Sequence, residues 1–136
     1  MDFSGLGILW LSGKRFRTVS IKIYACEKCG TCRKALQFLA ARRVRYTTVP
    51  IREHPPTLAE LERMLKIYGG DLRRLFNTSG QDYQRLKLKE KLARMTKDEV
   101  FALLARNGNL VKRPFVLSGS GGRAGFNEAE WEDLLK

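Results

Sequence analysis

The sequence predicts an α/β protein built on a mixed four-stranded sheet, with a helical segment inserted between the second and third strands. Short segments in which apolar and polar residues alternate are typical of strands, and apolar residues recurring every three to four positions are typical of helices. These segments follow one another in the order β-α-β, then several helices, then β-β-α. The first three elements favour a parallel pair of strands, and the late hairpin adds antiparallel strands.

The first three elements enclose a cluster of cysteines. Residues 20–24 alternate apolar and polar side chains and predict a strand. Residues 31–43 place apolar side chains on one face of a helix. Residues 45–51 are β-branched and aromatic, which predicts the second strand, and Pro55 and Pro56 then break the pattern.

The helical insertion is expected at about residues 57–107. Thr57 and Glu60 have the spacing of a capping box, in which two side chains satisfy the free N–H groups at a helix start. Thr96 and Glu99 repeat that spacing. Two shorter helices, separated by a polar turn, are expected between these two: residues 71–76 and 83–91, with the turn at 77–81.

The C-terminal part of the chain completes the sheet. Residues 114–117 predict a third strand, residues 118–122 a glycine-rich turn and residues 123–126 a short fourth strand. Asn127 is a favourable cap for a final helix that carries Trp131 on its apolar side.

Length and composition indicate one globular domain. A chain of 136 residues that is 43% hydrophobic can build one core, and we expect it over residues 20–136. Residues 1–19 show no clear period and are expected to be a poorly ordered extension. No apolar run approaches the ~20 residues of a membrane-spanning helix. The early positive charges follow the apolar run, whereas a secretory signal carries them before it, so we expect a cytoplasmic protein without membrane contact.

The formal net charge is +12, from 26 Lys and Arg against 14 Asp and Glu. Such an excess attracts nucleic acid, an acidic protein surface or an oxyanion, and it can equally be a solvated basic surface. The charges are scattered along the chain, so we expect no direct nucleic-acid binding.

Three cysteines lie within seven residues, at positions 26, 29 and 32. A tight cluster in a cytoplasmic protein favours redox or metal chemistry over a disulfide scaffold. Cys29 falls at the predicted start of a helix, where unpaired backbone N–H groups and the helix dipole favour a thiolate. Cationic side chains close by add to this effect: Lys28, Arg33 and Lys34. Cys29 is therefore the predicted nucleophile.

Cys32 lies three residues further along the same helical face, so it could resolve a mixed disulfide formed on Cys29. The structural alternative is that both are buried, unreactive cysteines. Cys26 is either an auxiliary resolving thiol or an inert residue at the end of a strand. A zinc or iron–sulfur site would need a fourth ligand, and His54 is the single histidine, so no metal is expected.

Arg113 and Pro114 precede the third predicted strand. A proline is tolerated at a strand start, and it could also form a cis peptide bond, which is rare and usually serves a purpose. The Arg113 guanidinium could bind an oxyanion or a carboxylate in a bidentate manner. The alternative is an ordinary surface arginine.

Taken together, these motifs resemble the ArsC/Spx family, which includes arsenate reductases. The resemblance runs from about residue 20 to the C-terminus. It is carried by several motifs in the same order: Cys29-Gly30-Thr31-Cys32-Arg33-Lys34-Ala35, Pro55-Pro56, residues 76–80, 86–89, 112–114 and 125–128. The resemblance implies a thioredoxin-like fold with a helical insertion, a cis-Pro114 beside the reactive cysteine, and Cys29 as the nucleophile.

The resemblance also implies a chemistry. In the reductases the cysteine attacks arsenate, glutathione resolves the adduct and glutaredoxin completes the reduction, so glutathione with glutaredoxin, or thioredoxin, is the expected electron donor and no cofactor is expected to be bound. The substrate or oxyanion contacts it implies are Gly30, Thr31, Arg33 and Arg113. Three arginines hold the oxyanion in the reductases, and one matches Arg113. The other two positions hold Asn77 and Phe126 here.

The reductases carry Ser at the position of Cys32. The C-x-x-C form is similar to the Spx-like branch, whose members use it as a redox switch and some of which bind RNA polymerase. We therefore favour a thiol–disulfide oxidoreductase with arsenate as candidate substrate, and keep a redox-switched transcriptional regulator as the alternative. The expected partners are a small thiol or redox protein, or RNA polymerase, and the expected state is a monomer.

Overall fold

The computed structural model describes residues 10, 11, 14, 15, 17–119 and 121–136. Two short strands, β1 (Trp10–Leu11) and β2 (Lys14–Arg15), pair antiparallel near the start of the chain. A poorly ordered extension was expected over residues 1–19; of these, residues 1–9, 12, 13 and 16 lie outside the described part. The first long strand begins at residue 17, earlier than the predicted residue 20.

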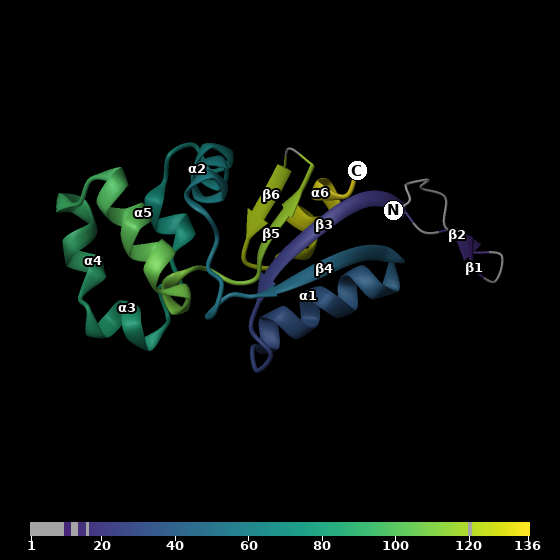
Figure 1. Cartoon of the computed structure of the whole chain (residues 1–136), viewed down its shortest axis with the longest axis horizontal. Helices are drawn as coiled ribbons and strands as arrows, with labels where there is room; N and C mark the ends of the chain where they lie inside the picture. Colours follow the sequence, from purple (N-terminus) through teal and green to yellow (C-terminus); the bar gives the residue numbers. More distant parts are fainter. Residues whose placement is uncertain (1–9, 12–13, 16, 120) are drawn as a thin grey trace.

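The principal sheet is mixed and four-stranded, with the order β4-β3-β5-β6, which confirms the predicted α/β fold class (Figure 1). Its strands are β3 (Arg17–Ala25), β4 (Val44–Pro50), β5 (Phe115–Ser118) and β6 (Gly121–Ala124). β3 pairs parallel with β4 and antiparallel with β5, and β5 pairs antiparallel with β6. The fourth strand was predicted at residues 123–126, which is wrong by two residues. Ser118 pairs directly with Gly121, so the turn is tighter than its glycine content suggested.

Helices cover both faces of this sheet. On one face, α1 (Gly30–Ala41) and α6 (Glu128–Leu134) pack against the strands. On the other face lies α2 (Leu58–Ile67). The strand residues alternate accordingly, because successive side chains in a strand point to opposite faces. Ile23 packs with the α1 and α6 side chains, and Tyr24 packs with those of α2.

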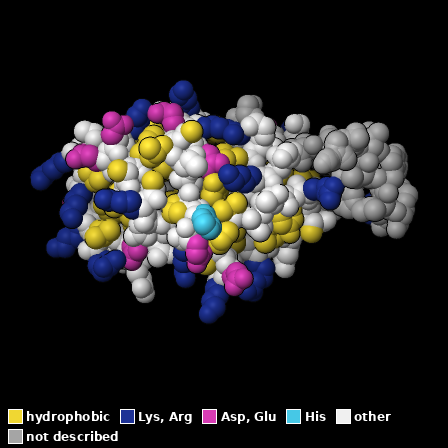
Figure 2. All heavy atoms as spheres, in the orientation of Figure 1, with side chains coloured by type: hydrophobic (Ala, Val, Ile, Leu, Met, Phe, Trp, Pro, Cys, Tyr) yellow, Lys and Arg dark blue, Asp and Glu magenta, His cyan; other side chains and the backbone are white. Residues whose placement is uncertain are grey.

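The helical insertion forms one end of the molecule (Figure 1). Its further elements are η1 (Leu72–Leu75), α3 (Gln81–Arg85), α4 (Leu88–Lys91), η2 (Leu92–Arg94), α5 (Lys97–Arg106) and η3 (Gly108–Leu110). Both predicted capping boxes are present, at the start of α2 and of α5. The single helix predicted over residues 83–91 is wrong, because Lys87 has a left-handed conformation (φ 56°) that separates α3 from α4. Figure 2 shows Lys and Arg side chains gathered over this end.

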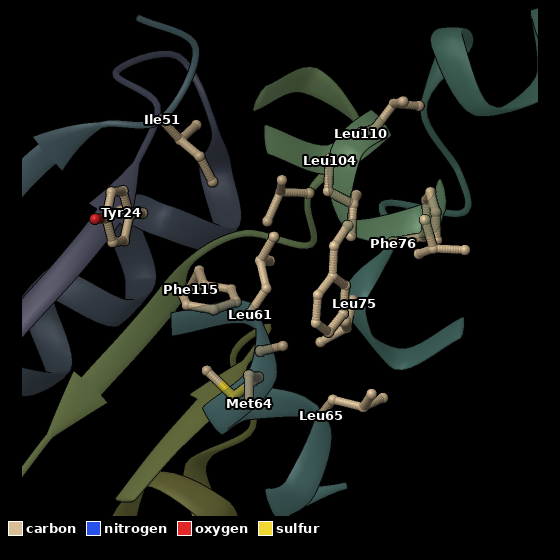
Figure 3. Close-up of a cluster of buried hydrophobic side chains, with 14 of the residues drawn as sticks. Tyr24, Ile51, Leu61, Met64, Leu65, Leu75, Phe76, Leu104, Leu110 and Phe115 are labelled. Carbon is tan, nitrogen blue, oxygen red and sulfur yellow. The ribbon is translucent and has the colours of Figure 1, made fainter. Parts of the chain in front are cut away.

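One apolar cluster joins the insertion to the sheet (Figure 3). It contains Tyr24 and Phe115 from the sheet, whose rings meet edge to face at 5.8 Å between centroids. Leu61 from α2 and Leu104 from α5 are completely buried in the same cluster. This shared core holds the insertion against the sheet near the end of β3, where the cysteine loop begins.

Among the described residues, no helix combines the length and the apolar character needed to cross a membrane.

Candidate active site

The cysteine loop connects β3 to α1. The N–H of Cys29 donates to the carbonyl oxygen of Cys26 (3.3 Å), which closes a turn directly before the helix. Cys29 has an extended backbone conformation and occupies the N-cap position of α1. Gly30 and Thr31 follow as the first exposed residues of the helix.

The Cys29 sulfur lies where a helix favours negative charge. It does not form the full side-chain cap that an Asp or Ser oxygen forms, but it faces the N–H groups of the first turn. Burial raises the pKa of the Cys29 thiol. Hydrogen bonds from the backbone and thiol of Cys32 and from the backbone of Thr31, together with the charge of Arg113, outweigh burial, and the net pKa is lowered.

Cys32 has the opposite character. Its side chain is 2% exposed, whereas Cys29 is half-buried, and all three cysteines are free thiols. The pKa of the Cys32 thiol is raised to about 12, mainly by burial. The hydrogen bond and the charge of Cys29 contribute to this rise, whereas the backbone N–H of Cys26 and the charge of Arg113 oppose it. The two sulfurs of Cys29 and Cys32 therefore lie within hydrogen-bond reach, one disposed to ionise and the other to keep its proton.

Cys29 opens into a polar hollow of about 460 Å³. Thr31 and Arg113, both sequence candidates, line it together with Cys29. Asn77 and Phe126, the two positions at which the resemblance expected arginines, line it as well. The hollow is polar and cationic, and it has the chemistry to hold an anion next to a thiolate.

Arg113 lies just before β5 and is followed by a proline. The Arg113–Pro114 bond is cis, as the resemblance implied, and Pro114 is buried at the start of β5. One terminal nitrogen of the Arg113 guanidinium is buried and has no hydrogen-bond partner among the described residues. Arg113 also lines the hollow, so its guanidinium places positive charge beside it.

Two further cations line the same hollow, Arg74 and Lys112, and the sequence assigned neither of them to the site. Arg74 comes from η1; its guanidinium lies 4.1 Å from the centre of the Tyr68 ring and 3.8 Å from a Glu130 carboxylate oxygen. Lys112 precedes Arg113. Arg74 lies 45 residues from Cys29 in sequence with no motif linking them, so only the docking of the insertion reveals it.

A second, larger hollow of about 800 Å³ also borders the cysteine loop and has a different lining. Cys26 and Cys32 line it, with Leu36 and Val49 as apolar neighbours. Arg33, expected from the resemblance to contact an oxyanion, lines this hollow and not the one that holds Cys29. The three cysteines thus divide between two openings.

Within the described part of the chain, no group of three or more His, Cys, Asp or Glu side chains has an arrangement that could hold a metal ion. His54, the single histidine, is exposed in the loop after β4.

The fold and the site define a class of protein: a thioredoxin-like α/β protein with a thiol at the start of its first long helix. The sequence pattern of the ArsC family matches residues 24–134, and the chain belongs to that family.

Individual proteins of known sequence or structure agree with this assignment. The chain is 42% identical over 115 residues to the uncharacterized protein YusI of Bacillus subtilis, which covers 85% of this chain and 98% of YusI. It is 24% identical to the global transcriptional regulator Spx 1 of Oceanobacillus iheyensis, over 85% of this chain and 86% of Spx 1.

Two solved structures are similar to the fold. A protein from Bacteroides fragilis described as ArsC family related has a TM-score of 0.78 at 40% identity, over 84% of this chain and 96% of its own. A possible arsenate reductase from Streptococcus mutans has a TM-score of 0.77 at 36% identity, over the same shares. Both confirm the thioredoxin-like fold.

Proposed function

We propose that this protein is a thiol–disulfide oxidoreductase in which Cys29 is the nucleophile and Cys32 the resolving thiol. The observation that carries the proposal is the pairing of the two sulfurs: Cys29 at the N-cap of α1 with a lowered pKa, and buried Cys32 donating a hydrogen bond to it. A thiolate is the reactive form of cysteine, so in this pair Cys29 is disposed to attack while Cys32 stays protonated.

The Cys32 thiol becomes reactive once Cys29 has reacted. Part of the rise in the Cys32 pKa comes from the Cys29 anion beside it. When Cys29 forms a covalent bond, its negative charge is lost and the Cys32 thiol ionises more readily. Cys32 then attacks the Cys29 sulfur, the partner leaves with the bonding electrons, and a Cys29–Cys32 disulfide remains.

Arsenate is the proposed oxyanion substrate. The Cys29 thiolate would displace hydroxide from arsenic(V), and Cys32 would attack the Cys29 sulfur of the adduct. Arsenic leaves as arsenite with two more electrons, and the two thiols become a disulfide. The cationic hollow supports this step, since Arg113 has an unpaired buried N–H and Arg74 and Lys112 lie in the same lining. A thiol donor, either glutathione with glutaredoxin or thioredoxin, would reduce the disulfide.

The proposed test is a coupled assay of arsenate reduction with each donor system, with wild type compared with Cys29→Ser and Cys32→Ser. We expect Cys29→Ser to lower turnover by at least about 1000-fold, because the nucleophile is lost. We expect Cys32→Ser to be active only with the glutathione system, whose thiol can resolve the adduct in its place. If neither variant lost activity, the assigned roles of Cys29 and Cys32 would be contradicted.

A redox-switched regulator is the second candidate. It is supported by the relationship to a protein named a global transcriptional regulator and by a group of exposed cations on the insertion. These cations are Arg85, Lys87, Lys89, Lys91, Arg94 and Lys97. An acidic surface of RNA polymerase would be their partner, with the Cys29–Cys32 pair as switch. Retention of polymerase by the immobilised protein in one redox state, and its loss in Cys29→Ser, would favour this function.

Either function suits a monomer in the cytoplasm, where thiol donors keep cysteines reduced. The proposed partner of the enzyme is a small thiol or a redox protein.

A further inference from the structure

Cys26 lies next to Cys32 and shares its hollow. Cys26 and Cys32 line the same hollow, and the backbone N–H of Cys26 lowers the pKa of the Cys32 thiol, as a nearby hydrogen-bond donor does. The Cys26 side chain is partly exposed and packs at the border of the apolar cluster. Cys32 is almost completely buried at the wall of the larger hollow. The Cys32 thiol is thus paired with Cys29, which lines the cationic hollow, and shares the lining of the larger hollow with Cys26.

The leaving-group abilities of Cys29 and Cys32 determine which sulfur of their disulfide a third thiol attacks. In thiol–disulfide exchange, the thiol that ionises more easily leaves faster. Within a Cys29–Cys32 disulfide, attack on the Cys32 sulfur expels Cys29, whose pKa is lowered by the helix start. Attack on the Cys29 sulfur would expel Cys32, whose pKa is raised. A thiolate of the same chain that reaches both sulfurs is thus favoured to bond to Cys32, which shares the larger hollow with Cys26.

We propose that Cys26 is a third redox thiol, which takes over the disulfide by attacking Cys32 and so transfers it from the cationic hollow to the larger one. The Cys26–Cys32 bond forms, the Cys29–Cys32 bond breaks, Cys29 leaves as a thiolate, and the Cys26 proton passes to solvent. The exchange is an isomerisation with no net oxidation. It rests on the proposed function for the first disulfide, and it frees Cys29 for another substrate while a reducing thiol acts from the other side.

The positions of the basic residues permit a direct test on the wild-type protein. Trypsin cuts after Lys22, Lys28 and Arg33, which puts Cys26 in one peptide (23–28) and both other cysteines in the next (29–33). The protein is oxidised with one equivalent of diamide, quenched in acid, blocked with N-ethylmaleimide at low pH, digested and analysed by mass spectrometry.

We expect a fraction of the oxidised protein to yield the two peptides joined by a disulfide, with the maleimide on Cys29. The remainder should show an internal disulfide in peptide 29–33 and the maleimide on Cys26. If every oxidised molecule carries the maleimide on Cys26 alone, the proposal is wrong.

A variant isolates the new bond. In Cys29→Ser, two thiols remain, and serine is a preferred N-cap residue, so the helix start is retained. We expect its titratable thiols to fall from two to none on oxidation, without dimer formation. The matched control is Cys26→Ser/Cys29→Ser, which should keep its one thiol. Retention of both thiols by Cys29→Ser would overturn the proposed transfer of the disulfide to Cys26.

The same assay separates this inference from the proposed function. Cys26→Ser keeps only Cys29 and Cys32, and formation of their disulfide depends on the proposed function alone. If Cys26→Ser forms its disulfide and Cys29→Ser does not, the transfer to Cys26 is wrong and the proposed oxidoreductase function is retained. If Cys26→Ser forms no disulfide, the proposed function is wrong, and the transfer to Cys26 is wrong with it.

Discussion

Two cysteines three positions apart on one helix have opposite chemistry because their surroundings differ. Cys29 lies at the open end of the helix, where N–H groups have no partners within the helix. Cys32 lies one turn further on, beneath the sheet, and is nearly inaccessible. At the scale of single residues, the site therefore depends on which sulfur the helix end and Arg113 can stabilise as an anion.

The role of Arg113 can be measured through the pH dependence of Cys29. We expect the rate of alkylation by iodoacetamide to reach half its maximum below the ~8.5 of an ordinary cysteine, since the pKa of Cys29 is lowered. Arg113→Met should move this midpoint to higher pH, because removal of a positive charge disfavours the thiolate. The same variant should raise the KM for arsenate, by at least about 10-fold for a lost charged hydrogen bond.

Arg106→Met is the matched control, since it removes an exposed arginine at the end of α5. It should leave the midpoint of alkylation unchanged. Arg33→Met should have a smaller effect on KM than Arg113→Met, because Arg33 lines the other hollow. A midpoint that stays the same in Arg113→Met would show that this guanidinium does not act on Cys29.

At the scale of elements, the start of α2 does more than cap a helix. Glu60 accepts from the backbone N–H of Thr57 (2.9 Å) as part of the capping box. The same carboxylate accepts from the Tyr24 hydroxyl (2.6 Å) and the Lys22 ammonium group (2.8 Å) of β3. The helix is thereby attached to the strand that leads into the cysteine loop.

Glu60→Ala should therefore cost more than the loss of a cap. We expect the free energy of unfolding to fall by about 2 to 3 kcal/mol in urea titrations, for the cap and the two side-chain hydrogen bonds together. The matched control is Glu99→Ala at the α5 capping box, where Glu99 accepts from Thr96 (2.8 Å). That variant should lose about 1 kcal/mol or less. Equal losses would mean that the contacts with β3 contribute nothing.

The Glu60 contribution should also depend on pH. Burial raises the pKa of the Glu60 carboxyl, but the hydrogen bonds from Lys22, Tyr24 and Thr57 outweigh burial and the pKa is lowered. A carboxyl with a lowered pKa in the folded state stabilises fully above its ordinary value of ~4.3. The stability difference between wild type and Glu60→Ala should thus be constant from pH 7 to about pH 5, and shrink as the pH falls through the folded pKa.

At the scale of the whole molecule, one close backbone contact fixes the insertion against the sheet. A Cβ atom added to Gly108 would lie 1.9 Å from the carbonyl oxygen of Ile51, which follows β4. The three nearest atoms all belong to the backbone of Ile51 and Arg52, so no side-chain rotation could relieve the overlap. This contact places η3 of the insertion against the segment that follows β4.

Gly108→Ala should separate the insertion from the segment that follows β4. We expect a loss of at least about 2 kcal/mol of unfolding free energy in urea, because the backbone itself must move. Gly30→Ala is the matched control: an added Cβ there meets nothing within 4 Å, and alanine favours a helix. It should change stability by less than about 1 kcal/mol. Similar stability of both variants would contradict this account of the docking.

Much of the fold follows from local patterns. The capping boxes at Thr57 and Thr96 and the cap at Asn127 are all present, because a side chain and a backbone group three residues apart suffice to form them. The errors lie where local signals are weak. The break at Lys87 has no marker in composition, because lysine carries no preference for the left-handed region. The glycines of residues 118–122 indicate a turn but not which of them belong to β6.

The sequence by itself determined that a cysteine lies at a helix start after a strand, with a second cysteine one turn away, since both depend only on residue spacing. Only the tertiary structure decided which cation faces which thiol: Arg74 and Arg113 lie with Cys29, while Arg33 lies with Cys26 and Cys32. The physical reason is range. A helix dipole acts within one turn of its own chain, whereas the charge and burial around a sulfur come from segments that meet only when the core closes.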